Sequence, residues 1–237
     1  MQGRSQDGAR WLDELHQGGH WQGLGQLVLH LWWHRALFHL LRDEHDEALT
    51  VYDEYLRNFE IDMVAALPDL YLDLQNATSL LLRLEFLNVD IGSRWTALAE
   101  ICAERVTDNT NAFSCAHYAA VLAADHRFYE AQALINSLTE SSRSGSSIAA
   151  SFGNAAIPAA IASVAHRQKD YRKVIDTLMP VRYRLDQMGG SHAQREVFLL
   201  MLADALQKEG ESDLLAKLSL DLRETGFEEI MAKRIIV

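Results

Sequence analysis

Apolar residues dominate residues 24–55 and follow the periodicity of two helices joined by a tight turn. The first of these helices is apolar on nearly every side, so we expect it to be buried on most of its surface. His30 and His34 interrupt that surface one turn apart and therefore share a face. The second helix is expected from Asp46, and small Ala48 leaves room there for a neighbouring helix. This helical hairpin is the predicted structural unit.

The same arrangement recurs along the chain as a turn that lies five positions before a small or aliphatic residue. These residues are Gly8, Ala48, Ala97, Ala131, Val174 and Leu215. Their spacings of 40, 49, 34, 43 and 41 residues are typical of helix-turn-helix repeats, although they are irregular. Phe128 and Tyr171, each just ahead of the small residue, are tetratricopeptide-like, as is the Leu-Met-Pro ending at Pro180. We therefore predict an all-α fold of tetratricopeptide-like hairpins that form an irregular α-solenoid.

Longer segments lie between these hairpins. Residues 69–87 are predicted to form the longest helix, with Asp73, Asn76 and Arg83 along one line. Residues 139–147 are polar and predict a flexible surface loop, but helical patterns continue on both sides. We therefore expect a single α-helical repeat domain over residues 1–237.

A second local signal begins at the pair Gly189-Gly190, which is predicted to end one helix. Ser191, with Gln194 three residues later, has the spacing of a capping box that starts the next helix. Free backbone N–H groups at this start, together with His192 and Arg195, would alternatively suit a carboxylate or phosphate. The cap is the favoured interpretation. No Gly-x-Ser-x-Gly elbow surrounds Ser191, which argues against nucleophilic catalysis.

Composition narrows the classes of partner. The net charge of −11 argues against a nucleic-acid backbone or an anionic membrane, because both bind basic patches. No run approaches the ~20 apolar residues of a membrane helix, and the N-terminus lacks the apolar segment of a secretory signal. Cys102 and Cys115 lie at apolar helical positions, so buried free thiols and a cytoplasmic location are expected. The glycine-rich turns lack a P-loop lysine, and no cofactor is predicted.

Four motifs together carry a resemblance to a known family. They are His-x-Trp-Trp-His (30–34), Ser-Leu-Leu-Leu-Arg-Leu (79–84), Gly-Ser-Arg-Trp (92–95) and Gly-Gly-Ser-His-Ala-Gln-Arg-Glu-Val-Phe (189–198). In order and separation they resemble the C-terminal part of the tetratricopeptide repeat protein 38 family over essentially the whole chain. The resemblance implies an α-helical repeat protein without an established reaction. Asn76 and Cys115 stand where that family pattern has a carboxylate, so acid–base or metal chemistry that used those groups would be lost here.

Polar residues on the inner faces of the predicted helices are the candidates for a ligand groove. They are His30, His34, Asp73, Asn76, Arg83, Arg94, His117, Ser191, His192 and Arg195. Asp73, Arg83 and Arg94, together with Glu85, would alternatively form ion pairs that hold helices in register. His30, His34 and Arg83 are expected to be buried and mutually close.

The two histidines also have the i, i+4 geometry of a metal-binding pair. His117 is the candidate third ligand, and Cys115 and Asp73 are further possibilities. Two hydrogen-bonded histidines in a helical core are favoured over a metal site. Trp32, Trp33 and Trp95 are likewise favoured as core residues over a ligand platform.

Two classes of function remain open at this point. The first is a binding module whose polar-lined groove holds a peptide, a protein partner or a small anionic ligand. The second is an enzyme, or a degenerate one, with a His/Asp/Arg site. Convergence of the candidates in one closed pocket would favour the enzyme, and individual pairing would favour the binding module. Trp11, Leu12 and Leu15 leave the first helix with an uncovered apolar face, which predicts a homodimer or a piece of a longer chain.

Overall fold

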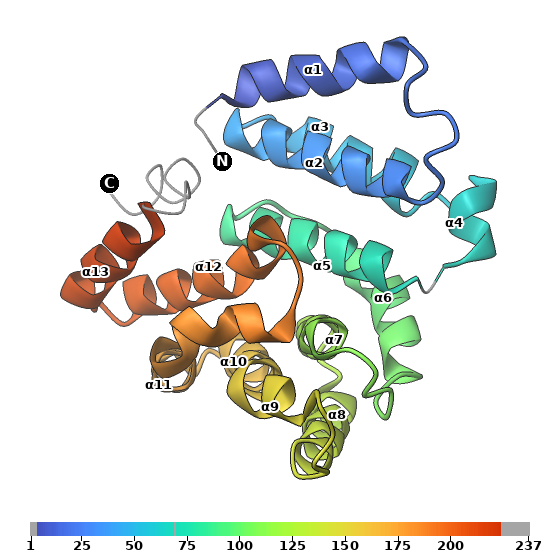
Figure 1. Ribbon diagram of the computed structural model, residues 1–237. Coiled ribbons are helices and arrows are strands. Elements are labelled where there is room, and N and C mark those ends of the chain that lie inside the picture. Colours follow the sequence, from blue (N-terminus) through green and yellow to red (C-terminus); the bar gives the residue numbers. More distant parts are fainter. Residues whose placement is uncertain (1–3, 69, 224–237) are drawn as a thin grey trace.

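The computed structural model describes residues 4–68 and 70–223, and every regular element within these ranges is helical (Figure 1). The all-α prediction is confirmed. The α-helices are α1 (Ser5–Gln17), α2 (Leu27–Leu41), α3 (His45–Val51), α4 (Asp62–Ala66), α5 (Tyr71–Phe86), α6 (Arg94–Ala103), α7 (Ala112–Ala124), α8 (Phe128–Ser141), α9 (Ala149–Ser151), α10 (Ile157–Arg167), α11 (Tyr171–Leu178), α12 (His192–Lys208) and α13 (Ser212–Arg223). Two π-helical segments, η1 (Tyr52–Leu56) and η2 (Phe152–Ala156), and one 3₁₀ segment, η3 (Met179–Met188), complete the order. No helix among the described residues is long and apolar enough to cross a membrane.

Four helix pairs are joined by the same three-residue turn: α2–α3, α7–α8, α10–α11 and α12–α13. The amide of the third turn residue donates to a carbonyl five residues earlier, as from Glu44 to His39. This bond and the positive φ of the middle residue define the Schellman ending of a helix. The middle residues are Asp43 (φ 61°), His126 (59°), Lys169 (62°) and Gly210 (73°). One local backbone turn therefore folds each pair into a hairpin.

The predicted repeat positions all fall on the fourth residue of a helix. The buried ones are Ala48, Ala131, Val174 and Leu215. Gly8 brings α1 close to α2, since a Cβ there would lie 2.3 Å from Phe38 Cζ. The prediction for Ala97 is wrong, because Ala97 is exposed and α6 buries Leu98 instead. The link 87–93 before α6 is longer than the three-residue turns, so α6 presents a neighbouring position to the core.

The first helices of the hairpins form the interior of the molecule. Helices α2, α5, α7, α10 and α12 each pack against the next one. In addition, α12 packs against α5, and Figure 1 shows these two helices side by side near the middle of the fold. The facing sides of α5 and α12 are therefore enclosed by protein. Arg83 and Val197, one from each helix, are both buried.

Three predicted boundaries need correction. Leu24 lies before α2 and is exposed, because the glycines on either side of it adopt positive φ and delay the helix. The segment 69–87 does not contain the longest helix, since α12 has 17 residues and α5 has 16. Asp69 lies outside the described residues. The predicted loop 139–147 begins later, because α8 continues through Ser141.

Candidate functional site

A chain of side-chain hydrogen bonds joins α2, α5 and α12. Gln194 Nε2 donates to Asn76 Oδ1 (3.1 Å), and Asn76 Nδ2 donates to His30 Nδ1 (3.2 Å). His30 Nε2 lies 3.1 Å from His34 Nε2. Because Asn76 donates to Nδ1, His30 carries its proton on Nε2 and donates it to His34, which makes both rings neutral. Burial lowers the pKa of His30 and lowers that of His34 to about 4.

Arg83 is the most deeply enclosed charged residue of this interior, with 1% of its surface exposed. Its guanidinium donates to Ala193 O (2.5 Å) and to Glu196 Oε2 (3.1 Å), both on α12. A charge at this depth is tolerated only when it is paired and hydrogen-bonded. Among the described residues, the hydrogen bonds of Arg83 go to Ser79 and to α12, and none joins it to His30 or His34, with which it was predicted to cluster. The two histidines are only half-buried.

His117 is fully enclosed on α7. Its Nδ1 donates to Phe113 O (2.8 Å), and its ring lies edge-on to Phe113 and Phe198. Burial lowers its pKa to about 4, so the ring is neutral. In the part of the chain that the structure describes, no three His, Cys, Asp or Glu side chains are placed to hold a metal ion. His117 therefore does not complete a site with His30 and His34.

The two cysteines are free and buried, as predicted. The Cys115 thiol donates to Asp108 O (3.1 Å). Burial raises the pKa of both Cys102 and Cys115 to about 12, which keeps the thiols protonated and unreactive.

Ser191 caps α12, which confirms the preferred interpretation of this motif. Ser191 Oγ accepts from Gln194 N (3.3 Å), and Gln194 Oε1 accepts from Ser191 N (2.9 Å). Arg195 donates to the carbonyls of Gly189-Gly190 rather than pointing at an open site. His192 is exposed beside the cap. The anion-site interpretation of this motif therefore gains no support.

The remaining charged candidates form ion pairs between helices. Arg94 donates to both carboxylate oxygens of Asp53 (2.9 and 2.5 Å). Glu85 accepts from Arg167 (2.7 Å). The alternative interpretation, that these charges hold helices in register, is confirmed for both.

Asp73 is the exception among the charged candidates. It is buried, and its Oδ1 has no hydrogen-bond partner among the described residues. Burial raises its pKa to about 6, and the charge of Arg57 acts in the opposite direction. Arg57 itself donates to Pro68 O (2.9 Å). Asp73 is thus an enclosed carboxyl rather than a groove residue.

Most of the groove candidates are enclosed or bonded among the residues that the structure describes. Asn76, Arg83 and His117 are enclosed, and nearly all of the other candidates are bonded to particular partners. The reason is the return of α12 onto α5, which covers the face that consecutive helical hairpins would leave open. Within residues 4–68 and 70–223 the candidates are bonded to separate partners: Asn76 to His30 and Gln194, Arg83 to Glu196, and Arg94 to Asp53.

The tryptophans belong mainly to the core. Trp33 and Trp95 are buried, which confirms the core prediction for both. Trp32 is half-buried and stacks on Tyr55 with ring centroids 3.7 Å apart. Trp32 therefore contributes to packing at the edge of the core.

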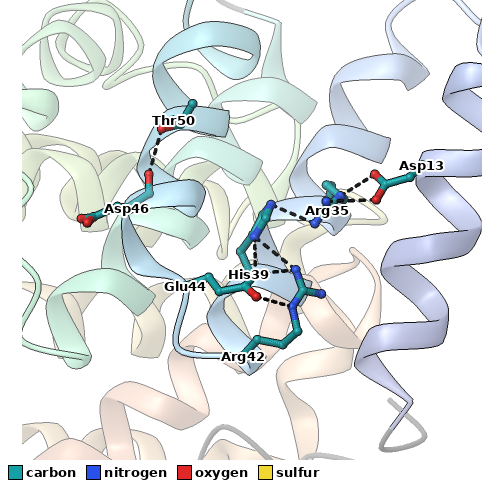
Figure 2. A network of polar contacts seen from close by, with 7 residues as sticks. All are labelled: Asp13, Arg35, His39, Arg42, Glu44, Asp46 and Thr50. Carbon is teal, nitrogen blue, oxygen red and sulfur yellow. Dashed lines mark hydrogen bonds and ion pairs between the residues drawn. The ribbon is translucent and has the colours of Figure 1, made fainter.

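A polar network that the sequence analysis missed fixes α1 to the α2–α3 hairpin (Figure 2). Arg35 donates to both carboxylate oxygens of Asp13 (2.7 and 3.1 Å) and to His39 Nε2 (2.8 Å). His39 Nδ1 donates to Glu44 (2.7 Å), and Arg42 also pairs with Glu44 (2.5 Å). Since Arg35 donates to Nε2, the His39 ring is neutral. Burial is the main cause that lowers the pKa of His39.

Two hollows lie outside the predicted candidates. The first has a volume of about 410 Å³ and lies between the link before α5 and the N-terminal half of α7. We call it the α7 pocket. Its lining includes Leu67, Leu70, Asp108, Asn111, Ser114 and Tyr118. Its lining comes from two separate stretches of the sequence, residues 67–70 and residues 105–118, so no local pattern indicated it.

The second hollow, also about 410 Å³, lies where α5, α10 and α12 end. His166 Nε2 donates to Asp204 Oδ2 (2.7 Å), and Lys208 Nζ pairs with the same oxygen (3.0 Å). His166 and Asp204 are 38 residues apart, so their sequence spacing carried no signal. The four-residue spacing of Asp204 and Lys208 was a local signal of an ion pair.

Comparison with known proteins adds no assignment to this geometry. No family model matches the chain, and no solved structure matches it.

Proposed function

We propose that this chain is a helical-repeat binding protein, with tetratricopeptide-like hairpins stacked as an irregular α-solenoid, that holds a peptide segment of a partner protein. Its polar interior supports the fold, and recognition occurs at its outer hollows. The proposal includes a relationship to the tetratricopeptide repeat protein 38 family.

The repeated turn supports the repeat architecture. Four hairpins end their first helix with the same backbone bond and with a middle residue in the left-handed conformation. Their first helices pack in succession, with α5 between α2 and α7. Each such hairpin buries one face only when it has neighbours, which is the organisation of repeat proteins. The return of α12 onto α5 makes the stack more closed than an open superhelix.

The observation that carries the functional proposal is the pairing of the interior polar groups. Arg83 is bonded to Glu196, Asn76 joins His30 to Gln194, and Ser191 caps α12. Acid–base catalysis needs a group that can reach a substrate proton. Enclosed and bonded side chains of this kind serve packing, so binding at the surface is the better account.

The motifs behind the family resemblance support the same proposal. Their polar residues meet in the interior: His30 connects to Gln194 through Asn76, and Arg83 binds Ala193 O. Residues that contact each other across three helices specify a fold. The shared motifs therefore support a similar architecture, and they do not point to a reaction.

The alternative is an enzyme, and the hydrogen-bonded pair of His166 and Asp204 in the second hollow is the observation that favours it. A His–Asp pair orients an imidazole for acid–base work. However, Asp204 is shared with Lys208, and the hollow is lined by no Ser, Thr or Cys that the imidazole would activate. We therefore place binding first.

The partner is proposed to be a protein or peptide rather than nucleic acid or membrane, given the net charge of −11. A second copy of this chain is included, because Trp11 on α1 is 59% exposed. Leu12, which was predicted to be uncovered with it, is buried within its own chain. The two buried free thiols suit a cytoplasmic location.

Selection from a random peptide library displayed with free C-termini tests the proposal. The immobilised full chain should enrich a family of related sequences, and a synthetic member should bind in solution with a one-to-one stoichiometry. A chain unfolded in denaturant and then coated on the same support is the control for sticky peptides. If repeated rounds enrich nothing beyond that control, peptide binding is not the function of this chain.

A further inference from the structure

We propose that the α7 pocket binds a carboxylate group attached to an apolar body, such as the C-terminus of a peptide or a small aliphatic acid. This assignment rests on the proposed binding function and names the chemistry that the site recognises. The evidence for it is the set of hydrogen-bond donors in the pocket that have no partner among the described residues.

Tyr118 lines the pocket and is the key residue of this proposal. Only 2% of its surface is exposed, and its hydroxyl has no hydrogen-bond partner among the described residues. The hydroxyl oxygen is accessible at the pocket surface and is therefore available to a ligand. Burial raises the pKa of this phenol to about 12, which keeps its proton available for donation.

The other free groups of the pocket are donors too. Ser114 Oγ accepts from Gln75 Nε2 (2.5 Å), which leaves the serine proton to donate. Asn111 uses its side-chain oxygen to cap α7 by accepting from Phe113 N and Ser114 N. Its amide nitrogen is left without a partner in the described part of the chain. A group that only accepts hydrogen bonds is the complement of these donors.

The one carboxylate among the described lining residues is bonded and paired. Asp108 Oδ1 accepts from the amide and the hydroxyl of Thr110, and Asp108 Oδ2 accepts from Arg105 (2.9 Å). Arg105 also lines the pocket, and it offsets the charge of Asp108 there. A ligand carboxylate is further favoured by the positive end of α7, a helix of 13 residues.

Shape and charge select the rest of the ligand. Leu67 and Leu70 supply an apolar wall beside the donors, and the volume of about 410 Å³ lies in the range of small-ligand sites, roughly 300–1,000 Å³. The net charge of −11 acts at long range, but physiological salt screens it beyond about 8 Å. Local donors therefore decide binding inside the pocket.

The test compares a carboxylate with its uncharged isostere. Calorimetry on the full chain should detect 4-methylpentanoate at millimolar concentration and no binding of 4-methylpentanamide. A peptide ending in Leu with a free C-terminus, compared with its amidated form, shows whether the carboxylate of a chain end is accepted as well. Equal binding of the acid and the amide would overturn the assignment.

Two variants locate the site without disturbing the fold. Tyr118→Phe removes a hydroxyl that no internal bond uses, so thermal stability should be unchanged while affinity falls about tenfold, as for a hydrogen bond to a charged group. Asn111→Asp keeps the oxygen that caps α7 but adds a negative charge, and it should abolish binding. Tyr129→Phe on α8, where Tyr129 is 85% exposed, is the matched control. Unchanged affinity in Tyr118→Phe would refute the pocket.

The outcomes separate this inference from the general function. If selected peptides bind equally well to wild type and Tyr118→Phe, the chain is a binding protein but the α7 pocket is not its carboxylate site. If 4-methylpentanoate binds in a way that depends on Tyr118 but no peptide is selected, the pocket is a carboxylate site and the proposal of a peptide partner is wrong.

Discussion

Gln194 Nε2 on α12 donates to Asn76 Oδ1 on α5 over 3.1 Å, although the two residues are 118 positions apart in the chain. Asn76 at the same time donates to His30 on a third helix. The side-chain amide of Asn76 therefore joins α2, α5 and α12.

Replacing Asn76 by Ala should lower the free energy of unfolding by about 1–3 kcal/mol, because His30 and Gln194 would each lose a partner. Urea denaturation followed by circular dichroism measures the change. Gln132→Ala is the control, since Gln132 bonds Asn136 on the exposed side of α8 and should change stability little. A variant as stable as wild type would show that the amide does not hold the helices.

Arg83→Met should cost about 3–5 kcal/mol, because it leaves the carboxylate of Glu196 buried and unpaired. The double variant Arg83→Met, Glu196→Leu removes both charges and should recover much of that loss. Equilibrium unfolding of wild type and these two variants gives the comparison. If the double variant is less stable than Arg83→Met alone, the two residues do not act as a pair.

The interior histidines predict a loss of stability in mild acid. The pKa of His117 is about 4 in the folded chain and about 6.5 in an unfolded one, so the unfolded chain binds more protons between these values. Stability contributed by this residue is therefore complete above pH 6.5 and falls as the pH drops towards 4. By pH 4.5 the loss should be about 2–3 kcal/mol for His117.

The measurement is the difference in unfolding free energy between pH 7 and pH 4.5, which should shrink by that amount in His117→Gln. The absolute stability of the variant is not the readout. His126→Asn changes an exposed histidine in a turn and should leave the difference as in wild type. The same difference in His117→Gln and wild type would contradict the assignment.

Ser191→Ala should cost roughly 1 kcal/mol through the lost cap of α12. Ser93→Ala is a matched control, since Ser93 precedes α6 at the same position but makes no capping bond with its side chain. Thermal melting of both variants compares them directly. Equal effects would mean that the bond from Gln194 N contributes nothing to stability.

Trp11→Glu tests whether a second copy covers α1. If the chain associates with itself there, sedimentation velocity at tens of micromolar should show a dimer for wild type and a monomer for the variant. Tyr129→Glu alters an aromatic residue on α8 that is even more exposed than Trp11, and it should leave the association intact. A wild-type monomer at this concentration would end the dimer hypothesis.

The hairpins were predictable because they are local. A turn at Asp43, His126 or Lys169 is specified by neighbouring residues, and the small residue five positions later follows from helix geometry. The cap at Ser191 was predictable for the same reason, since Gln194 is three residues away. Such features need no knowledge of where other helices lie.

The site could not be predicted because it depends on contacts between distant segments. Nothing near Arg83 indicates that its partner is Glu196, and the return of α12 onto α5 turned predicted groove residues into interior ones. Tyr118 carries a helical pattern like any core tyrosine, and its role emerges only when the link before α5 is placed beside it.

Hydrogen exchange of the full chain with and without a selected peptide tests most directly the claim that recognition occurs outside the polar interior. At saturation, exchange should slow in residues 105–118, which line the α7 pocket, and stay unchanged at the α12 cap around Ser191 and Gln194. Protection centred on the cap, with residues 105–118 exchanging as in the free chain, would contradict the account.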